Sequence, residues 1–292
     1  MQVETLKTFC DLAESRSFTK AAQINDVTQS AVSQTISTLE RRFKSLLIER
    51  SKKNFRLTRE GEVVYEYSKR ILQIRGELMS KMAEIQDTIS GEIRVATIYS
   101  IGLHVLPPYL TRFMKEYPTV NLHVEYRRPD QVYEDVVGNR MDLGLVAFPS
   151  PNAKLEVVPL RKEPLVLICS PQHPFAKLKS IKLKALNGQR VISFEPDIPT
   201  RKALDAIFKR QHVAVEHVME LDNIETLKRA VEIESGVAIV PQETIKPELA
   251  KQTLAAVKLE GNYVQPLGLI YRKKKVLSPA VKKFIALLRK SL

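Results

Sequence analysis

Short hydrogen-bonding side chains recur along one stretch of the sequence, between Thr28 and Ser37. Small hydroxyl and amide groups approach a base edge or a phosphate closely, and Gln and Ser have usable donors and acceptors in a DNA major groove. A helix that faces only water usually carries Glu, Lys and Arg instead. The side chains expected to contact double-stranded DNA from this stretch are Thr28, Gln29, Ser30, Ser33, Gln34 and Ser37.

The spacing of apolar residues places these polar groups on one face of a helix. The expected inward face consists of Ala31, Val32, Ile36, Leu39 and Phe43. Thr28 is the predicted N-cap, and the helix N-terminus itself favours a phosphate. A shorter helix with Thr19 as its predicted N-cap precedes it, and Asn25 and Asp26 supply the turn.

Ala22 of the first helix is small, so we expect the two helices to cross closely there, with Val32 of the second helix as its partner. This arrangement is typical of a helix-turn-helix, whose second helix enters the major groove. On periodicity alone, a three-helix bundle with a polar face remains the alternative.

A basic segment, "KSLLIERSKKNFRLT", follows the polar helix. Two apolar-rich stretches around a basic tip predict a β-hairpin wing that reaches phosphates or the minor groove. In isolation the same residues would be an ordinary solvated loop. The predicted DNA contacts from the wing are Arg50, Lys52, Lys53 and Arg56.

Residues 6–58 resemble the winged helix-turn-helix of LysR-type transcriptional regulators, in "FTKAA", "TQSAVSQTISTLE", "ER" and "RLTREG". The likeness continues over nearly the whole chain. The resemblance implies a tetrameric regulator that binds an imperfect inverted repeat of DNA, responds to a small co-inducer and contacts RNA polymerase. The sequence departs from the family pattern at Lys44 and Ile48, where Gly and Phe are usual, so Lys44 must adopt a left-handed backbone or the helix must end differently.

Apolar residues then recur at steps of three and four through residues 58–90, with Thr58 as the predicted N-cap. The seam consists of Val64, Tyr67, Ile71, Ile74, Leu78, Met82, Ile85 and Ile89. It predicts one long helix that pairs with a second copy, as in a coiled coil, and ends at the hinge formed by Ser90 and Gly91. A helix that lies on the domain behind it is the alternative.

From Glu92 onward, strand and helix patterns alternate, which predicts a parallel α/β sheet, with helices expected over residues 103–117 and 131–139. The last strand and helix have no partner in the second half and are expected to return to the first. The expected architecture is two α/β subdomains joined by two crossovers, with a cleft between them. This is similar to a type 2 periplasmic binding protein, on which the family's effector domain is built. The predicted domains are a winged helix-turn-helix (1–57), a linker helix (58–90) and an effector-binding domain (91–292), whose subdomains are 91–161 with 266–292, and 162–265.

Ligands of such sheets bind beyond the carboxyl ends of strands, near helix N-termini. Three segments qualify: residues 99–102 after the first strand, residues 197–201 after the strand "VISF", and residues 148–149 at the end of the third strand. The family places its effector contacts in the first two of them. Hydroxyl and guanidinium groups there favour a small carboxylate or other anion. Equally, Ser100 and Thr200 could be helix caps and Arg201 a surface ion-pair partner. The predicted effector contacts are Tyr99, Ser100, Ile101, Gly102, Phe148, Thr200, Arg201 and Asn223.

The net charge of +13 favours an acidic partner, such as nucleic acid or an anionic small molecule. Residues 1–90 hold 15 Lys and Arg against 12 Asp and Glu, so most of the excess lies downstream, where a basic C-terminal helix has no assigned role. Cys10 and Cys169 sit among apolar neighbours, which indicates reduced thiols and a cytoplasmic protein. No signal peptide and no membrane span are expected.

Nothing in the sequence favours an enzyme. The five histidines are scattered, without metal-ligand spacing, and neither a glycine-rich phosphate loop nor a nucleophile elbow occurs. We therefore expect no metal and no cofactor. A solute-binding protein is a second hypothesis, because residues 91–292 have that architecture. A third hypothesis is a nucleoid-type DNA binder, whose affinity falls with salt and ignores sequence.

Overall fold

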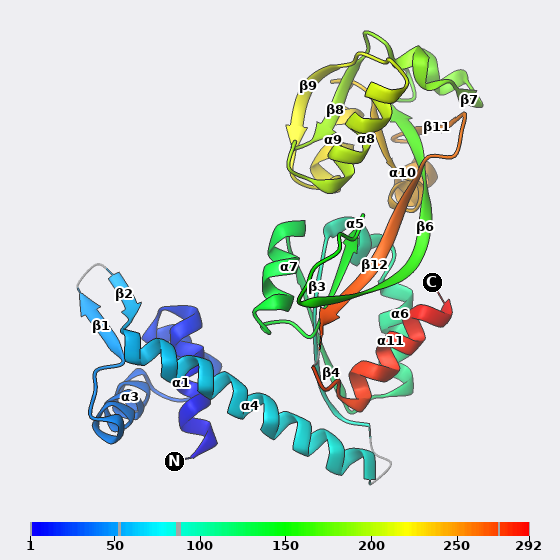
Figure 1. The fold of residues 1–292 in the computed structure, drawn as a ribbon. Helices are drawn as coiled ribbons and strands as arrows, with labels where there is room; N and C mark the ends of the chain where they lie inside the picture. Colours follow the sequence, from blue (N-terminus) through cyan, green and yellow to red (C-terminus); the bar gives the residue numbers. More distant parts are fainter. Residues whose placement is uncertain (1, 52–53, 86–88, 274, 292) are drawn as a thin grey trace. The chain divides into compact units, whose positions relative to one another are not determined.

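The chain forms two compact units, residues 1–88 and 89–292. The computed structural model describes residues 2–51, 54–85, 89–273 and 275–291 (Figure 1). Each unit has its own apolar core.

The first unit combines short helices, a two-stranded hairpin and one long helix. Its elements are α1 (Val3–Ser15), α2 (Phe18–Ile24), α3 (Gln29–Phe43), β1 (Ile48–Ser51), β2 (Asn54–Leu57) and α4 (Arg59–Ile85). The core of this unit lies between α1, α2 and α3 and includes Phe9, Ala22, Val32, Ile36 and Leu39. The strands β1 and β2 pair in antiparallel register from Ile48 opposite Leu57 to Ser51 opposite Asn54.

Capping side chains explain where α2 and α3 begin. The Thr28 hydroxyl accepts a hydrogen bond from the Ala31 amide, which confirms Thr28 as the cap of α3. The prediction of Thr19 as the cap of α2 is wrong, because the Ser17 hydroxyl accepts from the Lys20 amide and the helix already begins at Phe18.

Two expectations at the end of α3 have different outcomes. Lys44 does adopt the left-handed backbone, with φ of 53°, and its amide bonds to the Glu40 carbonyl. Phe43, expected to face inward, is 42% exposed, because the buried residues of α3 end at Leu39 and the last turn extends past the core.

The helix α4 begins against the hairpin and continues beyond it. Thr58 caps it through the Gly61 amide, and the Thr58 hydroxyl donates to the Leu46 carbonyl. The first turns of α4 pack on the core through Val64 and Tyr65, and Lys69 pairs with Glu14 of α1. Farther along α4, the side chains of Tyr67, Ile71, Ile74, Leu78 and Met82 are exposed.

The first lobe of the second unit is built on a mixed sheet, in which the three strands between residues 91 and 147 are parallel, as expected. Its elements are β3 (Gly91–Thr97), α5 (Tyr99–His104), α6 (Pro107–Glu116), β4 (Val120–Tyr126), α7 (Pro129–Val137), β5 (Leu143–Ala147), β12 (Val264–Arg272) and α11 (Pro279–Ser291). The strand β3 pairs in parallel with β4 and β5, but β12 is antiparallel to β5. The last strand thus returns to the first lobe, as expected, but it enters the sheet from the opposite end.

The helix expected over residues 103–117 is two helices. Pro107 lacks an amide hydrogen and is favoured at the first turn of a helix, so it opens α6, while α5 begins earlier, at Tyr99. The side chains of Ile101, Phe113 and Phe284 bring these helices and α11 onto the same core.

The second lobe contains the strands and helices between the two crossovers. Its main elements are β6 (Leu155–Cys169), β7 (Ser180–Ile181), β8 (Arg190–Phe194), α8 (Pro199–Arg210), β9 (Glu216–Leu221), α9 (Ile224–Glu232), β10 (Ala238–Pro241), α10 (Lys246–Lys251) and β11 (Ala255–Leu259), with short 3₁₀ turns at Pro174–Lys177, Leu183–Leu186 and Gln242–Ile245. The long strands β6 and β12 pair with each other and run from one lobe into the other (Figure 1). They are the two crossovers that the sequence predicted.

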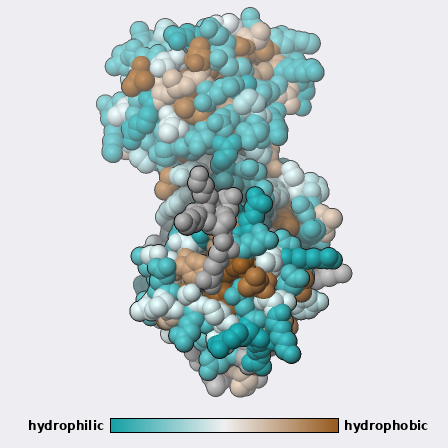
Figure 2. Space-filling view, turned by 90° about the vertical axis from the view of Figure 1, so that its left-hand side faces the viewer, coloured by the Kyte–Doolittle hydropathy of each residue, from teal (hydrophilic) through white to brown (hydrophobic). Residues whose placement is uncertain are grey.

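Hydrophilic residues predominate on the face shown in Figure 2, and hydrophobic residues form small groups there. Among the described residues, no helix combines the length and the apolar character that a membrane span requires.

Candidate functional site

The polar face of α3 is exposed along its length. Its N-terminal turn starts at Thr28, whose hydroxyl lies 2.8 Å from that of Ser30. The opposite face is buried through Val32, Ile36 and Leu39, so packing leaves the polar side chains pointing outward. The exposed members of the predicted set are Thr28, Gln29, Ser30, Gln34 and Ser37, and Ser33 is half-buried.

The turn before α3 contains Asn25 and Asp26, as predicted, and the structure shows which contacts hold it. The Asn25 amide donates to Asp11 and to the Ala21 carbonyl, and its oxygen accepts from Lys7. Asp26 follows with φ of 51°. These contacts tie the turn and the end of α2 to α1.

The hairpin presents one predicted basic side chain that the structure describes. Arg56 lies on β2, is exposed and stands opposite Glu49 in the register. Arg50 is on β1, but its side chain is not described, and Lys52 and Lys53 lie outside the described residues.

The predicted seam of α4 divides into three parts. Val64 packs on the core of the first unit. The exposed part consists of Tyr67, Ile71, Ile74, Leu78 and Met82, with Ile74 63% exposed. Ile89 does not belong to the helix, because it packs on the core of the second unit. The side chain of Ile85 is not described.

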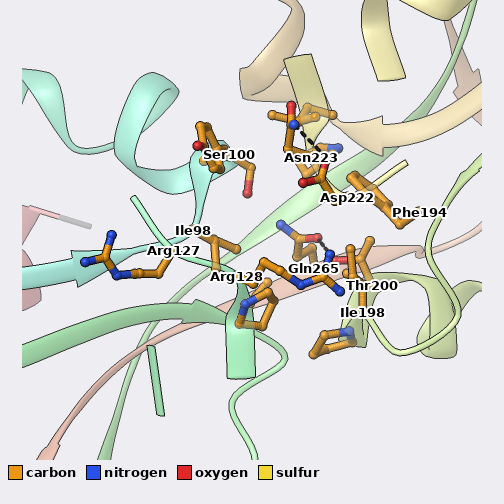
Figure 3. A pocket seen from close by; sticks show the side chains of 16 residues that line it. Ile98, Ser100, Arg127, Arg128, Phe194, Ile198, Thr200, Asp222, Asn223 and Gln265 are labelled. Carbon is orange, nitrogen blue, oxygen red and sulfur yellow. Dashed lines mark hydrogen bonds between the residues drawn. The ribbon is translucent and has the colours of Figure 1, made fainter. Parts of the chain in front are cut away.

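A pocket of about 550 Å³, which includes its opening to solvent, lies where the two lobes of the second unit meet. Its walls come from the ends of β3, β4 and β8, the first turns of α8 and α9, and the crossover β12. Figure 3 shows that polar side chains from both lobes surround it, including Ser100, Arg128, Thr200, Asn223 and Gln265.

Four of the predicted effector contacts line this pocket: Tyr99, Ser100, Thr200 and Asn223. The Tyr99 ring stacks on that of Tyr126 with 5.3 Å between the ring centroids. The Asn223 oxygen caps α9 by accepting from the amides of Glu225 and Thr226. Thr200 donates to the Oε1 atom of Gln265 at 3.0 Å.

The other four predicted effector contacts lie outside the wall of this pocket. Ile101 is buried in the core of the first lobe. Phe148 packs on the same core, and its own backbone has a φ of 47°. Gly102 is buried too, and a Cβ there would come within 2.6 Å of Thr97 and Tyr126.

Arg201 is the fourth, because its guanidinium turns away into the second lobe. It donates to Asp205, Glu220 and the Phe194 carbonyl. Burial alone would lower the pKa of Arg201, but the hydrogen bonds that it donates to these carboxylates raise its pKa above the ordinary value. Its charge is thus neutralised within its own lobe.

Sequence reasoning missed other polar residues of the pocket wall. Arg127 and Arg128 directly follow β4, so the strand-end rule that selected Tyr99 and Phe148 would also have found them. Arg128 donates to Glu195 at 2.6 Å and to Asp197 at 2.9 Å, which raises its pKa and joins the two lobes. Gln265 gave no such signal, because it reaches the pocket only through the path of β12.

Neither a metal site nor a reactive thiol was found in the described parts of the chain. They contain no cluster of three or more His, Cys, Asp or Glu side chains that could hold a metal ion. Both cysteines are buried, and burial raises the pKa of Cys10 to about 12 and that of Cys169 to about 11.

Two family models match the chain. The one described as "LysR substrate binding domain" covers residues 86–292, and the one described as "Bacterial regulatory helix-turn-helix protein, lysR family" covers residues 3–62. The chain therefore belongs to the LysR family of DNA-binding transcriptional regulators, with a helix-turn-helix and an effector-binding domain. This family consists of regulators rather than enzymes, and the fold predicted from the sequence is confirmed.

Individual relatives agree with this assignment. The HTH-type transcriptional activator CmpR of Synechocystis sp. is 30% identical over 278 residues, which cover 95% of this chain and 91% of CmpR. Full-length CbnR complexed with its target DNA superposes with a TM-score of 0.70 at 21% identity, over 100% of both chains. The CcmR regulatory domain of Synechocystis PCC6803 in complex with 2-PG has a TM-score of 0.64 at 26% identity, over 69% of this chain and 97% of that one.

Proposed function

We propose that this chain is a ligand-responsive regulator that binds an imperfect inverted repeat at promoters. The observation that carries the proposal is the exposed face of short polar side chains on α3, whose other face is fixed in the core. Two copies of α3 enter successive major grooves, and the hairpins contact the flanking backbone through Arg50, Lys52, Lys53 and Arg56.

The proposed domains are a winged helix-turn-helix over residues 1–57, a linker helix over 58–90 and an effector-binding domain over 91–292. Two chains pair through the exposed apolar residues of α4, and two such dimers form a tetramer. The support for pairing is the row from Tyr67 to Met82, because so narrow and so exposed a stripe is typical of a coiled-coil seam.

The proposed effector is a small anion bound in the pocket between the lobes. The support is the set of polar side chains from both lobes, together with the 2-PG bound by the related regulatory domain. An effector bound there contacts both lobes at once, so it favours the lobe arrangement that fits it best. The size of the response is limited by its differential affinity for the two arrangements.

Capture of sheared genomic DNA by the purified full-length chain, near physiological salt and followed by sequencing, tests the proposal. We expect a few promoters that share an inverted repeat, and the neighbouring genes then nominate effectors. Uniform recovery would contradict sequence specificity and favour a nucleoid-type binder. No recovery would leave a solute-binding module as the better account.

The two kinds of DNA contact are separated by substitution. Gln29→Ala or Ser33→Ala should reduce the preference for the captured sites over random DNA. Arg56→Ala should weaken binding to all sequences and reduce the magnitude of the slope of log affinity against log salt concentration by about one. Arg75→Ala, an exposed charge on α4 that pairs with Glu4, is the matched control and should leave this slope unchanged. Equal losses for both classes on specific and random DNA would contradict this division.

A further inference from the structure

Gln265 is the buried polar side chain of the pocket whose hydrogen bonds are incomplete. It is 1% exposed and lines the pocket from the crossover strand β12. Its Oε1 atom accepts from the Thr200 hydroxyl at 3.0 Å, but its Nε2 atom has no partner among the described residues. A buried donor without a partner is unfavourable, so a bound acceptor would gain from it.

Thr200 holds the amide of Gln265 in this orientation. The two side chains lie next to each other in the pocket, joined by their hydrogen bond (Figure 3). Thr200 stands in the first turn of α8, a helix of 12 residues. The amides of this first turn and the helix dipole favour negative charge at the same wall. The open donor of Gln265 is thus combined with a local preference for an anion.

The basic side chains of the pocket already have partners. Arg128 is paired with Glu195 and Asp197. Arg127 is paired with Glu125 and Asp135. The charge of both guanidinium groups is thus already compensated by carboxylates, whereas the Nε2 atom of Gln265 has no partner among the described residues.

We propose that Gln265 is a specificity-determining ligand of the effector pocket and that its Nε2 atom donates to a carboxylate or phosphate oxygen of the effector. This inference rests on the proposed role of the pocket. Thr200 acts as a positioning residue, because it fixes which end of the amide faces the ligand. The neutral amide analogue of the same compound should bind more weakly, because it offers no anionic acceptor.

The test is calorimetric titration of the full-length protein with glycolate, inorganic phosphate, 2-PG and glycolamide. Glycolate and phosphate separate the two oxyanions, and glycolamide is the neutral match of glycolate. We expect at least one oxyanion to bind and glycolamide to bind less well. Gln265→Met keeps the length of the side chain and removes the donor, so it should weaken the bound oxyanion about tenfold or more.

Three further variants make the result specific. Gln242→Met changes an exposed glutamine outside the pocket and should bind like the wild type. Thr200→Val should reduce the preference for glycolate over glycolamide, because the amide is then free to turn. Ser100→Ala alters the pocket wall contributed by α5 and tests whether the probe occupies the pocket at all. Unchanged circular dichroism and unchanged capture of DNA without a probe show that each variant is folded.

The possible failures are distinguishable. If Gln265→Met binds the oxyanion as tightly as the wild type while Ser100→Ala does not, the pocket is the site but Gln265 is not its ligand. If both variants bind like the wild type, the probe lies elsewhere and the proposed effector role of the pocket is wrong. If glycolamide binds as well as glycolate, or if no oxyanion binds, the ligand class is wrong.

Discussion

The start of α4 leaves no room for a side chain at Gly61. A Cβ built on this glycine would lie 2.0 Å from the carbonyl oxygen of Leu47 and 3.0 Å from its carbonyl carbon. That oxygen cannot simply turn away, because it accepts a hydrogen bond from the Thr58 amide at 3.1 Å. Gly61→Ala should therefore force α4 and the start of the hairpin apart.

The size of the effect follows from two opposing contributions. Alanine is favoured over glycine in a helix by about 1 kcal/mol. Overpacking usually costs about 1–3 kcal/mol, and more where the contact is backbone and must move by over 1 Å. We expect Gly61→Ala to destabilise the first unit by a net of about 1–3 kcal/mol. Gly76→Ala in the same helix is the control, because nothing lies within 4 Å of its Cβ and it should stabilise by about 0.5–1 kcal/mol.

Hydrogen exchange of the buried turns of α1 and α3 measures the difference within the full chain. A loss of about 1–3 kcal/mol corresponds to exchange about five to 150 times faster where opening is at equilibrium. Amides of the second unit serve as the internal reference. If Gly61→Ala exchanges as slowly as the wild type, the close approach of α4 to Leu47 is not a feature of the folded protein, and this reasoning is wrong.

Three further predictions concern the second unit and the thiols. Lys228 is 1% exposed and contacts Glu225, Glu248 and the Thr244 carbonyl. Lys228→Met leaves these carboxylates without their cation and should lower the free energy of unfolding, measured by urea titration, by about 3–5 kcal/mol. Lys246→Met removes an exposed charge and should change this free energy little. Burial, and then the charge of Arg201, lowers the pKa of His217 below 6.5. The unfolded chain then binds more protons than the folded one between that lowered pKa and 6.5, so stability should fall as the pH drops through this window, and His217→Asn should flatten the difference between urea midpoints at pH 7.5 and 5.5. Because burial raises the pKa of both Cys10 and Cys169, neither should react with iodoacetamide in the native protein at neutral pH, and both should react in denaturant; labelling of the native chain would contradict this.

Local signals in the sequence were sufficient wherever neighbouring residues decide the structure. The cap at Thr28 and the burial of Val32, Ile36 and Leu39 depend on contacts within a few residues, and the structure agrees with both. Thr19 was mistaken for a cap because Ser17, two residues earlier, offers the same chemistry. The antiparallel entry of β12 could not be predicted, because strand direction is set by the long path of the chain through the second lobe.

The same distinction explains the pocket. The strand-end rule selected Tyr99, Ser100 and Thr200, which line the pocket and lie two to six residues beyond their strands. Arg201, which the rule also selected, lies outside the pocket wall, because helical geometry turns this side chain of α8 into the lobe, toward Asp205 one turn along and Glu220 of β9. The rule could not find Gln265, because cross-strand pairing of β12 with β6 brings this residue to the pocket from far along the chain.

The contacts between the lobes indicate how a ligand could change their arrangement. Arg128 of the first lobe holds Glu195 and Asp197 of the second, and His104 of α5 lies 2.7 Å from Glu225 of α9. Burial would raise the pKa of Glu225, but hydrogen bonds from His104 and Lys228 lower it, so the ionised carboxylate is the form that joins the lobes. A lobe arrangement that breaks these contacts is less favourable by their free energy. An effector shifts the population toward such an arrangement by as much as it binds that arrangement more tightly, and the arrangement predominates only when this difference exceeds the free energy of the lost contacts.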